Sequence, residues 1–317
     1  MDAIETEALT KNYSIGFSRP RPYRALDGLT LRVAPGEVFG CLGPNGAGKT
    51  TTLKLLMQLV FPTSGTARIL GRPVGDLEVR RRIGYLPENP YFYDYLTAQE
   101  LLEYFAGLFG YGSAERRARA SRLLDEVGIA GERRLQLRKF SKGMIQRVGI
   151  AQALINDPEV LFLDEPMSGL DPLGRREIRQ LVLRLRDRGC TVFFSSHVLS
   201  DAEALCSRVG ILVGGKLIAS GTVSELLSGR TKGWELVVSG VSREVAARVT
   251  ADGVKVTSVG DDRHVLELPL TSPPERVIAA LVCHGASVVS LTPMRDTLED
   301  FFVQRVATAS SDRGLAS

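Results

Sequence analysis

Nine consecutive residues, 43–51, carry the strongest chemical pattern in the chain, and they read GPNGAGKTT. Glycine, four free positions, glycine, lysine and threonine form the phosphate-loop pattern, in which glycines let backbone N–H groups turn toward a polyphosphate. Lys49 would reach the β- and γ-phosphates, and the Thr50 hydroxyl would ligate Mg²⁺. The residues expected to contact the nucleotide here are Gly43, Pro44, Asn45, Gly46, Ala47, Gly48, Lys49, Thr50 and Thr51.

The elements on either side of this loop fit the same chemistry. Residues 37–42, EVFGCL, are a short apolar run of strand type, and residues 51–60 have helical spacing. The phosphates would therefore lie at a helix N-terminus, where the macrodipole favours anions. The alternative is a glycine-rich turn that matches the pattern by chance, and a strand before it with a helix after it argues against that alternative.

A pair of carboxylates ends another apolar run, VLFLDE, at residues 160–165. Asp164 could hold Mg²⁺ through water, and Glu165 could polarise an attacking water. Glu165 could instead merely cap the following turn. A phosphate loop in the same chain favours the catalytic role for the pair.

A second helix end follows at residues 140–158, FSKGMIQRVGIAQALINDP. Ser141 is typical of an N-cap residue, and the helix behind it is strongly periodic. Its N-terminus is a second anion site, separate from the first. One nucleotide does not need both, whereas two copies of the chain placed head to tail would use them. Each ATP would then be held by the phosphate loop of one copy and the Ser141 helix end of the other.

Composition limits the possible functions of the chain. Its 317 residues are 44% hydrophobic and 24% charged, which is typical of a soluble globular protein. A formal charge of +4 is too small to imply nucleic acid or an acidic membrane surface as a partner. No apolar run approaches the roughly 18 residues that span a bilayer, and residues 1–13 do not read as a secretory signal. Any membrane role is therefore expected to come through a partner protein.

The four cysteines are scattered and form no CxxC pair. Cys41 and Cys190 flank or lie in apolar runs and are expected to be small buried hydrophobes. Nothing in their spacing suggests a disulfide framework, so a reducing compartment is expected.

Strand-like and helix-like segments alternate through residue 229, which predicts an α/β fold with a largely parallel sheet covered on both faces. Among the helices, residues 96–109 begin with a capping box formed by Thr97 and Glu100, and residues 113–128 end at a glycine. The expected domains are 1–229, with a helical subdomain at about 88–157, then 230–306, and a disordered tail at 307–317.

A polar linker, SGRTKG at 228–233, precedes the second domain. The order of elements after it reads β-α-β-β-α-β, a small α+β arrangement of ferredoxin-like type. Pro293 is expected to break the chain, and residues 295–306 to form a closing amphipathic helix. His264 and His284 are expected to serve packing or the surface, since nothing near them resembles a metal site.

Taken together, these motifs resemble those of the nucleotide-binding subunits of ABC transporters, over roughly residues 3 to 229. The matches occur in the family's order: Tyr13 as the adenine-stacking aromatic, 43–51 as the Walker A loop, YLPEN (85–89) as the Q-loop, FSKGM (140–144) as the signature motif, 160–165 as Walker B, SGLD (168–171) as the D-loop and His197 as the switch histidine. Extra residues follow Tyr13, so Tyr23 could stack on the base instead.

The chain departs from most relatives at two of these motifs. The usual signature is LSGGQ, and here Lys142 and Met144 replace a glycine and the glutamine, while Ser141 and Gly143 are kept. The Q-loop carries Glu88 in place of glutamine, which could bind Mg²⁺ or water but adds negative charge beside the triphosphate. Both departures are similar to the ABC type-2 exporter branch, and the segment 291–302, LTPMRDTLEDFF, resembles the accessory domain of that branch.

The resemblance implies a P-loop NTPase of the ABC ATPase type with ATP and Mg²⁺ as cofactors. Lys49, Glu165 and His197 would be catalytic; Thr50, Glu88 and Asp164 would bind the metal. Tyr13, Glu88, Ser141, Gly143 and Asp171 would join the phosphate loop in holding nucleotide, with Asp171 coupling the two sites of a homodimer. The partner would be a transmembrane permease, which places the chain in the cytoplasm, peripheral on the cytoplasmic face of the cell inner membrane. Export is the implied direction.

The aromatic-rich segment 88–100, ENPYFYDYLTAQE, would form the groove for a permease helix, or else would pack the helical subdomain. The C-terminal unit would stabilise the dimer or regulate it. A rival function is that of a soluble ATPase of the same superfamily, a nucleotide switch acting on ribosomes or DNA. Such chains usually have two cassettes or a coiled-coil insertion and a basic face, and this chain has none of these.

Overall fold

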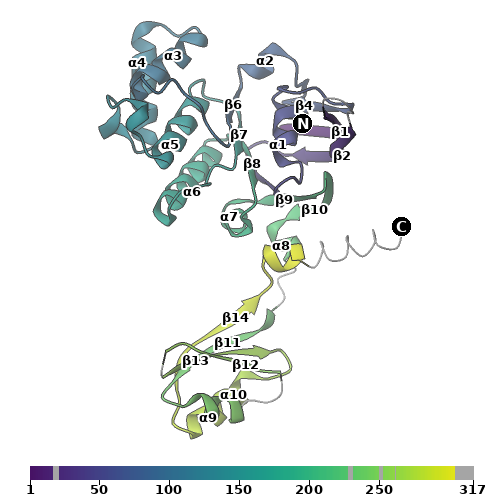
Figure 1. Ribbon diagram of the computed structural model, residues 1–317, viewed down its shortest axis with the longest axis vertical. Helices are drawn as coiled ribbons and strands as arrows, with labels where there is room; N and C mark the ends of the chain where they lie inside the picture. Colours follow the sequence, from purple (N-terminus) through teal and green to yellow (C-terminus); the bar gives the residue numbers. More distant parts are fainter. Residues whose placement is uncertain (17–20, 228–230, 250–252, 261, 304–317) are drawn as a thin grey trace. The chain divides into compact units, whose positions relative to one another are not determined.

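The computed structural model describes residues 1–16, 21–227, 231–249, 253–260 and 262–303 (Figure 1). The chain divides into two compact units, Met1–Val223 and Ser224–Ser317. The sequence places this boundary at 229/230, on the far side of the short helix α8 (Val223–Leu226). Among the described residues, no helix has both the length and the apolar character needed to cross a bilayer.

The first unit is built on a six-stranded sheet that is parallel apart from one edge strand. Its order is β10 (Lys216–Thr222), β9 (Arg208–Val213), β3 (Val38–Leu42), β8 (Thr191–Ser196), β7 (Val160–Asp164) and β6 (Ile83–Leu86). Every residue of β3, β7 and β8 is buried, as expected for strands covered on both faces. The predicted α/β class is therefore confirmed, with the single change that residues 208–222 form an antiparallel hairpin, β9 and β10.

Helices cover both faces of this sheet. Figure 1 shows α1 (Lys49–Leu56) on one side of β7 and β8 and α6 (Pro172–Asp187) on the other. The helix α7 (Leu199–Leu205) packs on β3 and β8. The predicted helix 51–60 is too long, because α1 ends at Leu56 and Gln58 adopts a left-handed backbone with φ of 53°.

An antiparallel sheet at the N-terminus completes the core. Its order is β2 (Arg21–Val33), β1 (Ile4–Ile15), β4 (Ser64–Ile69) and β5 (Arg72–Pro73). One hydrophobic cluster joins it to the parallel sheet through residues such as Leu26, Phe39 and Leu53. Because β1 pairs with β2, Tyr13 and Tyr23 lie directly opposite one another.

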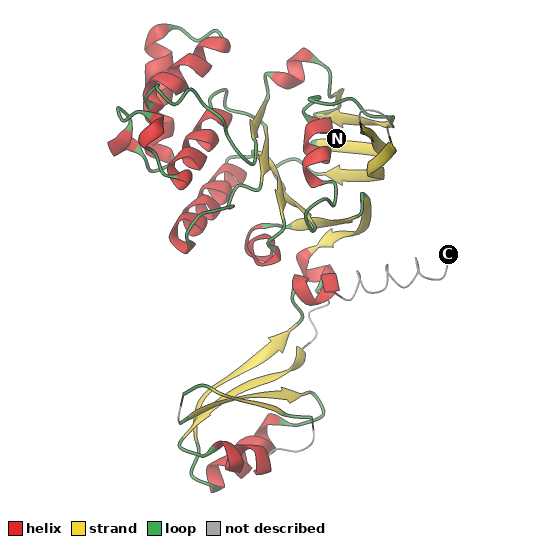
Figure 2. Cartoon of the chain, in the orientation of Figure 1, coloured by secondary structure: helices red, strands yellow, loops and turns green. Residues whose placement is uncertain are grey.

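Three further helices of the first unit form a group of their own (Figure 2). They are α3 (Ala98–Leu108), α4 (Ser113–Glu126) and α5 (Lys142–Ala153), with short 3₁₀ turns at Ala130–Glu132 and Leu137–Lys139. The short helix α2 (Leu77–Arg80) lies apart from them and packs on the main core through Val79. The predicted capping box of α3 is present in both directions between Thr97 and Glu100. Gly128, with φ of 74°, follows the end of α4, and the Ser141 side chain caps α5 by accepting from the Met144 N–H. Local sequence signals therefore set these boundaries.

The second unit has the predicted β-α-β-β-α-β order. Its elements are β11 (Thr231–Ser239), α9 (Arg243–Val249), β12 (Lys255–Ser258), β13 (Arg263–Pro269), α10 (Pro274–Cys283) and β14 (Ser287–Arg295). The strands form one antiparallel sheet of order β12-β13-β11-β14 around a small apolar core. His264 is buried and bonded to the Ser258 hydroxyl and the Val241 carbonyl, which is a packing role.

Two expectations for the C-terminal end were wrong. Pro293 does not break the chain, because β14 continues through it to Arg295, and an edge strand tolerates proline. The closing helix starts later than predicted, since residues 298–303 are helical and Arg295 still belongs to β14. Residues 304–306 of that predicted helix and the predicted tail 307–317 lie outside the described residues.

Candidate functional site

The phosphate loop connects β3 to α1, and its shape permits only glycine at two positions. A Cβ atom at Gly43 would lie 2.2 Å from the Leu212 carbonyl oxygen, and one at Gly48 would lie 2.6 Å from the Ala25 carbonyl oxygen. Gly48, the N-cap residue of α1, also has φ of 108°, which residues other than glycine rarely adopt. The loop is therefore held against two other backbone segments, and its N–H groups are left at the start of a helix.

Lys49 is buried beneath this loop and is only 6% exposed. Its Nζ donates to the Gly43 carbonyl at 2.7 Å and to the Pro44 carbonyl at 3.2 Å. It also pairs with Glu165 Oε1 at 3.4 Å. The ammonium group thus stands between the loop and the end of β7, where a phosphate charge would be neutralised.

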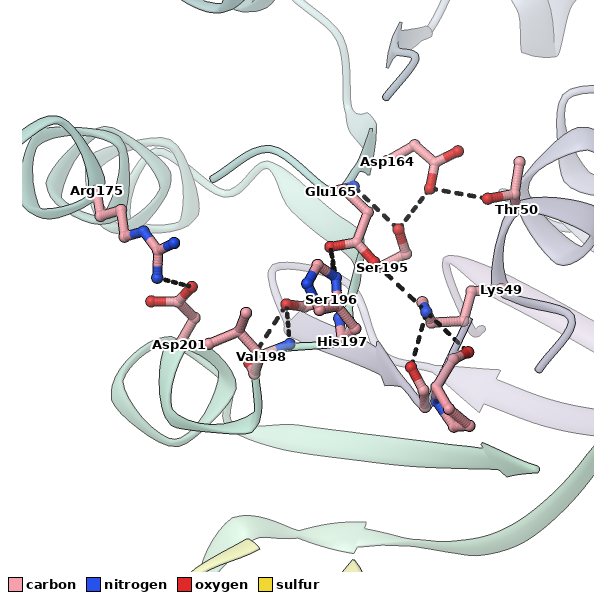
Figure 3. Close-up of polar contacts among 12 residues, drawn as sticks. Lys49, Thr50, Asp164, Glu165, Arg175, Ser195, Ser196, His197, Val198 and Asp201 are labelled. Carbon is pink, nitrogen blue, oxygen red and sulfur yellow. Dashed lines mark hydrogen bonds and ion pairs between the residues drawn. The ribbon is translucent and has the colours of Figure 1, made fainter. Parts of the chain in front are cut away.

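Asp164 is the centre of a hydrogen-bonded group at the end of β7 (Figure 3). Its Oδ1 accepts from the Ser195 hydroxyl at 2.6 Å and from the Thr50 hydroxyl at 3.3 Å. Burial raises the pKa of this carboxyl; Glu88 raises it further, while bonds from Ser195 and Thr50 and the charge of Lys49 act in the opposite direction. A divalent cation would favour the charged form strongly.

The donors available here fit Mg²⁺ in particular. Thr50 and Asp164 offer hard oxygen atoms close together, and Glu88 lies near enough to shift the pKa of Asp164. Among the described residues no cluster of three or more His, Cys, Asp or Glu side chains could enclose a metal alone. Mg²⁺ typically keeps waters and uses one or two carboxylates together with substrate phosphates, so Thr50 and Asp164 would suffice as its protein ligands.

Glu165 and His197 form a direct pair beside this group. The His197 Nδ1 lies 2.8 Å from Glu165 Oε2, and the Glu165 N–H donates to the Ser195 hydroxyl at 3.0 Å. Glu165 has a left-handed backbone with φ of 48°. This conformation costs about 1–2 kcal/mol for any residue other than glycine. Strained backbone of this kind is concentrated at functional sites, where it fixes the direction of a side chain. The three residues predicted to be catalytic, Lys49, Glu165 and His197, therefore meet in one place.

A pocket of about 410 Å³ opens over these groups. It is lined by Tyr13, Tyr23, Ala25, Asn45, Gly46, Ala47, Gly48, Lys49, Thr50, Thr51, Glu88, Glu165 and His197. Tyr13 and Tyr23 face each other across β1 and β2 and both line the pocket, so either ring could contact a base. Lys11 lies over the Tyr13 ring at 5.1 Å from its centroid. Gly43 and Pro44 are not in the lining and act through their carbonyls on Lys49.

The other predicted nucleotide residues lie elsewhere. Ser141, Gly143 and Asp171 line a separate pocket of about 630 Å³, which shares no residue with the first. The Asp171 side chain caps α6 by accepting from the Gly174 N–H at 2.8 Å. The predicted site is thus divided into two halves within one chain.

Sequence reasoning missed one polar residue of the site. Ser195 bonds both Asp164 and the Glu165 N–H, and it is the last residue but one of the buried strand β8, two residues before His197. A hydroxyl at the carboxyl end of such a strand is a signal that could have identified it. Cys41, at the end of β3, has a pKa raised to about 12 by burial and therefore remains an inert thiol.

Comparison with known proteins agrees with this geometry. Residues 26–168 match the family model described as ABC transporter. An uncharacterized ABC transporter ATP-binding protein of Synechocystis is 43% identical over 307 residues, covering 96% of this chain and 85% of the relative. The bacitracin transport ATP-binding protein BcrA of Bacillus licheniformis is 36% identical over 306 residues, covering 96% of this chain and 97% of the relative.

Solved structures are similar to part of this chain. A dimeric ATP-binding cassette in a post-hydrolysis state, bound to ADP and phosphate, is 28% identical with a TM-score of 0.64. The match covers 69% of this chain and 98% of the chain in that structure. A structure described as the ATP binding subunit of an ABC transporter is 32% identical with a TM-score of 0.63; it covers 71% of this chain and 92% of its own. The chain therefore belongs to the family of ABC transporter ATP-binding proteins and is an ATPase.

Proposed function

We propose that two copies of this chain close head to tail around two ATP molecules and that this movement drives export through a separate membrane permease. The observation that carries the proposal is the division of the nucleotide residues between two pockets with no residue in common. A chain that completed its site alone would bring Ser141 and Asp171 to the phosphate loop. A dimeric cassette among similar structures supports the same arrangement.

The chemistry follows from the residues around Glu165. This carboxylate would accept a proton from a water aligned with the γ-phosphorus, and general-base catalysis is typically worth about 10²–10⁴ in rate. His197 holds the carboxylate through Nδ1 at 2.8 Å, so its other ring nitrogen is not used by that bond and would contact the γ-phosphate. Lys49 and the loop amides would offset the phosphate charge. Thr50 and Asp164, with Glu88 nearby, would hold Mg²⁺, which would supply further neutralisation of the phosphate charge.

Mixed dimers test the shared site directly. One copy would carry Lys49→Ala, which disables the first pocket, and the other Ser141→Arg, which blocks the second. In a head-to-tail dimer both defects fall in one composite site and leave the other intact, so ATP hydrolysis should return when the two variants are mixed. Ser141 is exposed, so the arginine need not disturb the core.

A matched control pairs Lys49→Ala with Thr50→Ala. Both substitutions disable the first pocket, so each composite site of the mixed dimer has a defect and no activity should return. Recovery of ATP hydrolysis in this control would contradict the shared site. So would a first mixture that forms ATP-dependent dimers on size exclusion but does not regain hydrolysis.

The surface for the permease is proposed from the aromatic segment 88–100. Tyr91 is 98% exposed, Tyr93 54% and Tyr95 60%, although the Tyr93 ring also contacts those of Tyr95 and Tyr104. Rings this exposed contribute little to packing, and a cluster of exposed aromatic side chains is typical of a protein interface. These values favour the docking role over the packing role.

Alanine at Tyr91 and Tyr95 should prevent co-purification with the permease while the basal ATPase rate is retained. Phe61, which is 68% exposed outside this segment, is the control position for Phe61→Ala. If the Tyr91 and Tyr95 variants lose ATP binding or stability while still co-purifying, the segment serves packing.

The direction and location of transport rest on relatives. BcrA is named for bacitracin transport, and the DrrA protein of Streptomyces peucetius, 36% identical over 318 residues, is named for daunorubicin and doxorubicin resistance. The name of DrrA, which refers to drug resistance, supports efflux, and we assign this chain to the cytoplasmic face of the cell membrane as a peripheral subunit. The unit 230–306 would then be an accessory domain that regulates or stabilises the dimer.

A further inference from the structure

Arg175, on the first turns of α6, links two segments that the site requires. Its Nε donates to the Leu170 carbonyl at 3.3 Å, and one of its terminal nitrogens pairs with Asp201 Oδ2 at 3.7 Å. Leu170 belongs to the segment 168–171, which reaches the second pocket, and Asp201 lies in the first turn of α7. A single guanidinium group thus contacts both segments.

Asp201 connects this link to the catalytic pair. Its side chain is only 7% exposed, so its charge is costly unless it is paired. The helix α7 starts two residues after His197, and the Ser196 hydroxyl bonds both the N–H and the carbonyl of Val198 within the intervening turn. A short hydrogen-bonded turn therefore connects α7 to His197.

Figure 3 shows the resulting order of side chains, from Arg175 through Asp201 and Val198 to His197 and Glu165. A small cavity of about 80 Å³ lies among them and is lined by both pairs, Arg175 with Asp201 and His197 with Glu165. The catalytic pair therefore borders open space on this side, where fewer van der Waals contacts hold it. Polar contacts at the cavity wall would then contribute more to its alignment.

We propose that Arg175 is a positioning residue for ATP hydrolysis. It holds the turn that carries His197 at a fixed place relative to the segment 168–171. This maintains the 2.8 Å contact between His197 and Glu165. This inference rests on the proposed function, in which Glu165 activates the water. Arg175 itself does not line the first pocket, so it should not contribute to ATP binding.

The substitution Arg175→Ala should lower kcat about tenfold or more, because a displacement near 1 Å in a catalytic group can cost about 10²-fold in rate. The Kd for ATP, measured in the Glu165→Gln background, should stay within about twofold. Arg175→Lys should be intermediate, since one ammonium can pair with Asp201 but lacks the fork that reaches Leu170 as well. Arg176→Ala, an exposed arginine on the same helix, is the control and should leave kcat unchanged.

Asp201→Asn guards against a simple loss of folding, because it removes the buried charge and keeps the size of the side chain. It should lower kcat by a similar factor, and Arg175→Ala combined with it should lower kcat no further than either change alone. Three results would overturn the inference. They are a wild-type kcat in both single variants, losses of kcat that are fully additive in the double variant, and a loss of kcat that is explained by a fall in Tm. If the unaltered chain neither dimerises nor hydrolyses ATP, the proposed function fails instead.

Discussion

Replacing Glu165 by glutamine separates binding of ATP from its hydrolysis. Glutamine keeps the shape of the side chain and can still bond His197, which now lies 2.8 Å from the carboxylate. It cannot accept a proton from water. We therefore expect kcat to fall by about 10²–10⁴, equivalent to about 3–5 kcal/mol of transition-state stabilisation.

ATP binding should survive this change and become tighter. At the observed 3.4 Å, the Lys49–Glu165 pair has a gross Coulomb attraction of about 5 kcal/mol at an effective dielectric constant of about 20. Removing the carboxylate charge releases Lys49 for the phosphates and removes a negative charge beside them. Lys49 keeps the carbonyls of Gly43 and Pro44 as partners, so the loop should retain its shape.

The assay combines phosphate release with size exclusion in the presence of ATP and Mg²⁺. The Glu165→Gln chain should elute as a dimer that retains ATP, while the unaltered chain should return to monomers as ATP is consumed. Glu159→Gln is the control, because Glu159 is an exposed carboxylate next to the other end of β7 and pairs with Arg82. Hydrolysis at the unaltered rate, or loss of ATP binding, would refute the role given to Glu165.

Three further predictions concern the same pocket. Asp164→Asn should raise Tm near pH 7, because burial raises the pKa of Asp164 above 3.8 and the buried charge therefore lowers stability as pH rises through that raised pKa. Thermal unfolding measured across pH should show that the gain in Tm disappears below about pH 4, where the carboxyl is protonated in both states. A variant with the same Tm as the unaltered chain at every pH would refute this prediction. Glu88→Gln should tighten ATP binding without Mg²⁺ and raise the Mg²⁺ concentration for half-maximal hydrolysis, whereas an unchanged Mg²⁺ titration would remove Glu88 from the metal site. Tyr13→Ala should weaken ATP binding by about 1–3 kcal/mol, the usual value of base stacking, in equilibrium titrations; a larger loss for Tyr23→Ala would assign the base to Tyr23.

Local signals explain most of what the sequence predicted correctly. The capping residues Thr97 and Ser141 bond their own helix ends, so three or four neighbouring residues determine each boundary. The phosphate loop likewise depends on its own glycines and on the strand and helix beside it. The division of the site into two halves also followed from the sequence, because two helix N-termini offered separate anion sites.

Features that depend on distant packing were harder to predict. The strand β1 has several shifts of register along its pairing with β2, which blurs the alternation that identifies a strand. Apolar spacing continued past the end of α1 because Met57 and Val60 still pack on the core after the helix has stopped. Pro293 was misleading because the rule against proline applies to central strands, and only the fold shows that β14 is an edge.

The roles of Ser195 and Arg175 needed the structure for a different reason. Ser195 bonds Asp164, which lies 31 positions earlier in the chain. Arg175 contacts two separate segments, through Leu170 and Asp201. A hydroxyl or a guanidinium has many possible partners along a chain of this length. Only the fold selects among them.

The backbone contacts of the phosphate loop tie nucleotide binding to the edge of the main sheet. The Ala47 carbonyl accepts from the Gly215 N–H at 3.0 Å, and the Gly215 carbonyl accepts from the Asp27 N–H at 2.8 Å. Gly215 forms the tip of the β9–β10 hairpin, so this tip is bonded to the loop on one side and to β2 on the other. A triphosphate that stiffens the loop would thereby slow amide exchange at a hairpin tip it never touches, and the edge of the sheet would report whether the subunit is loaded.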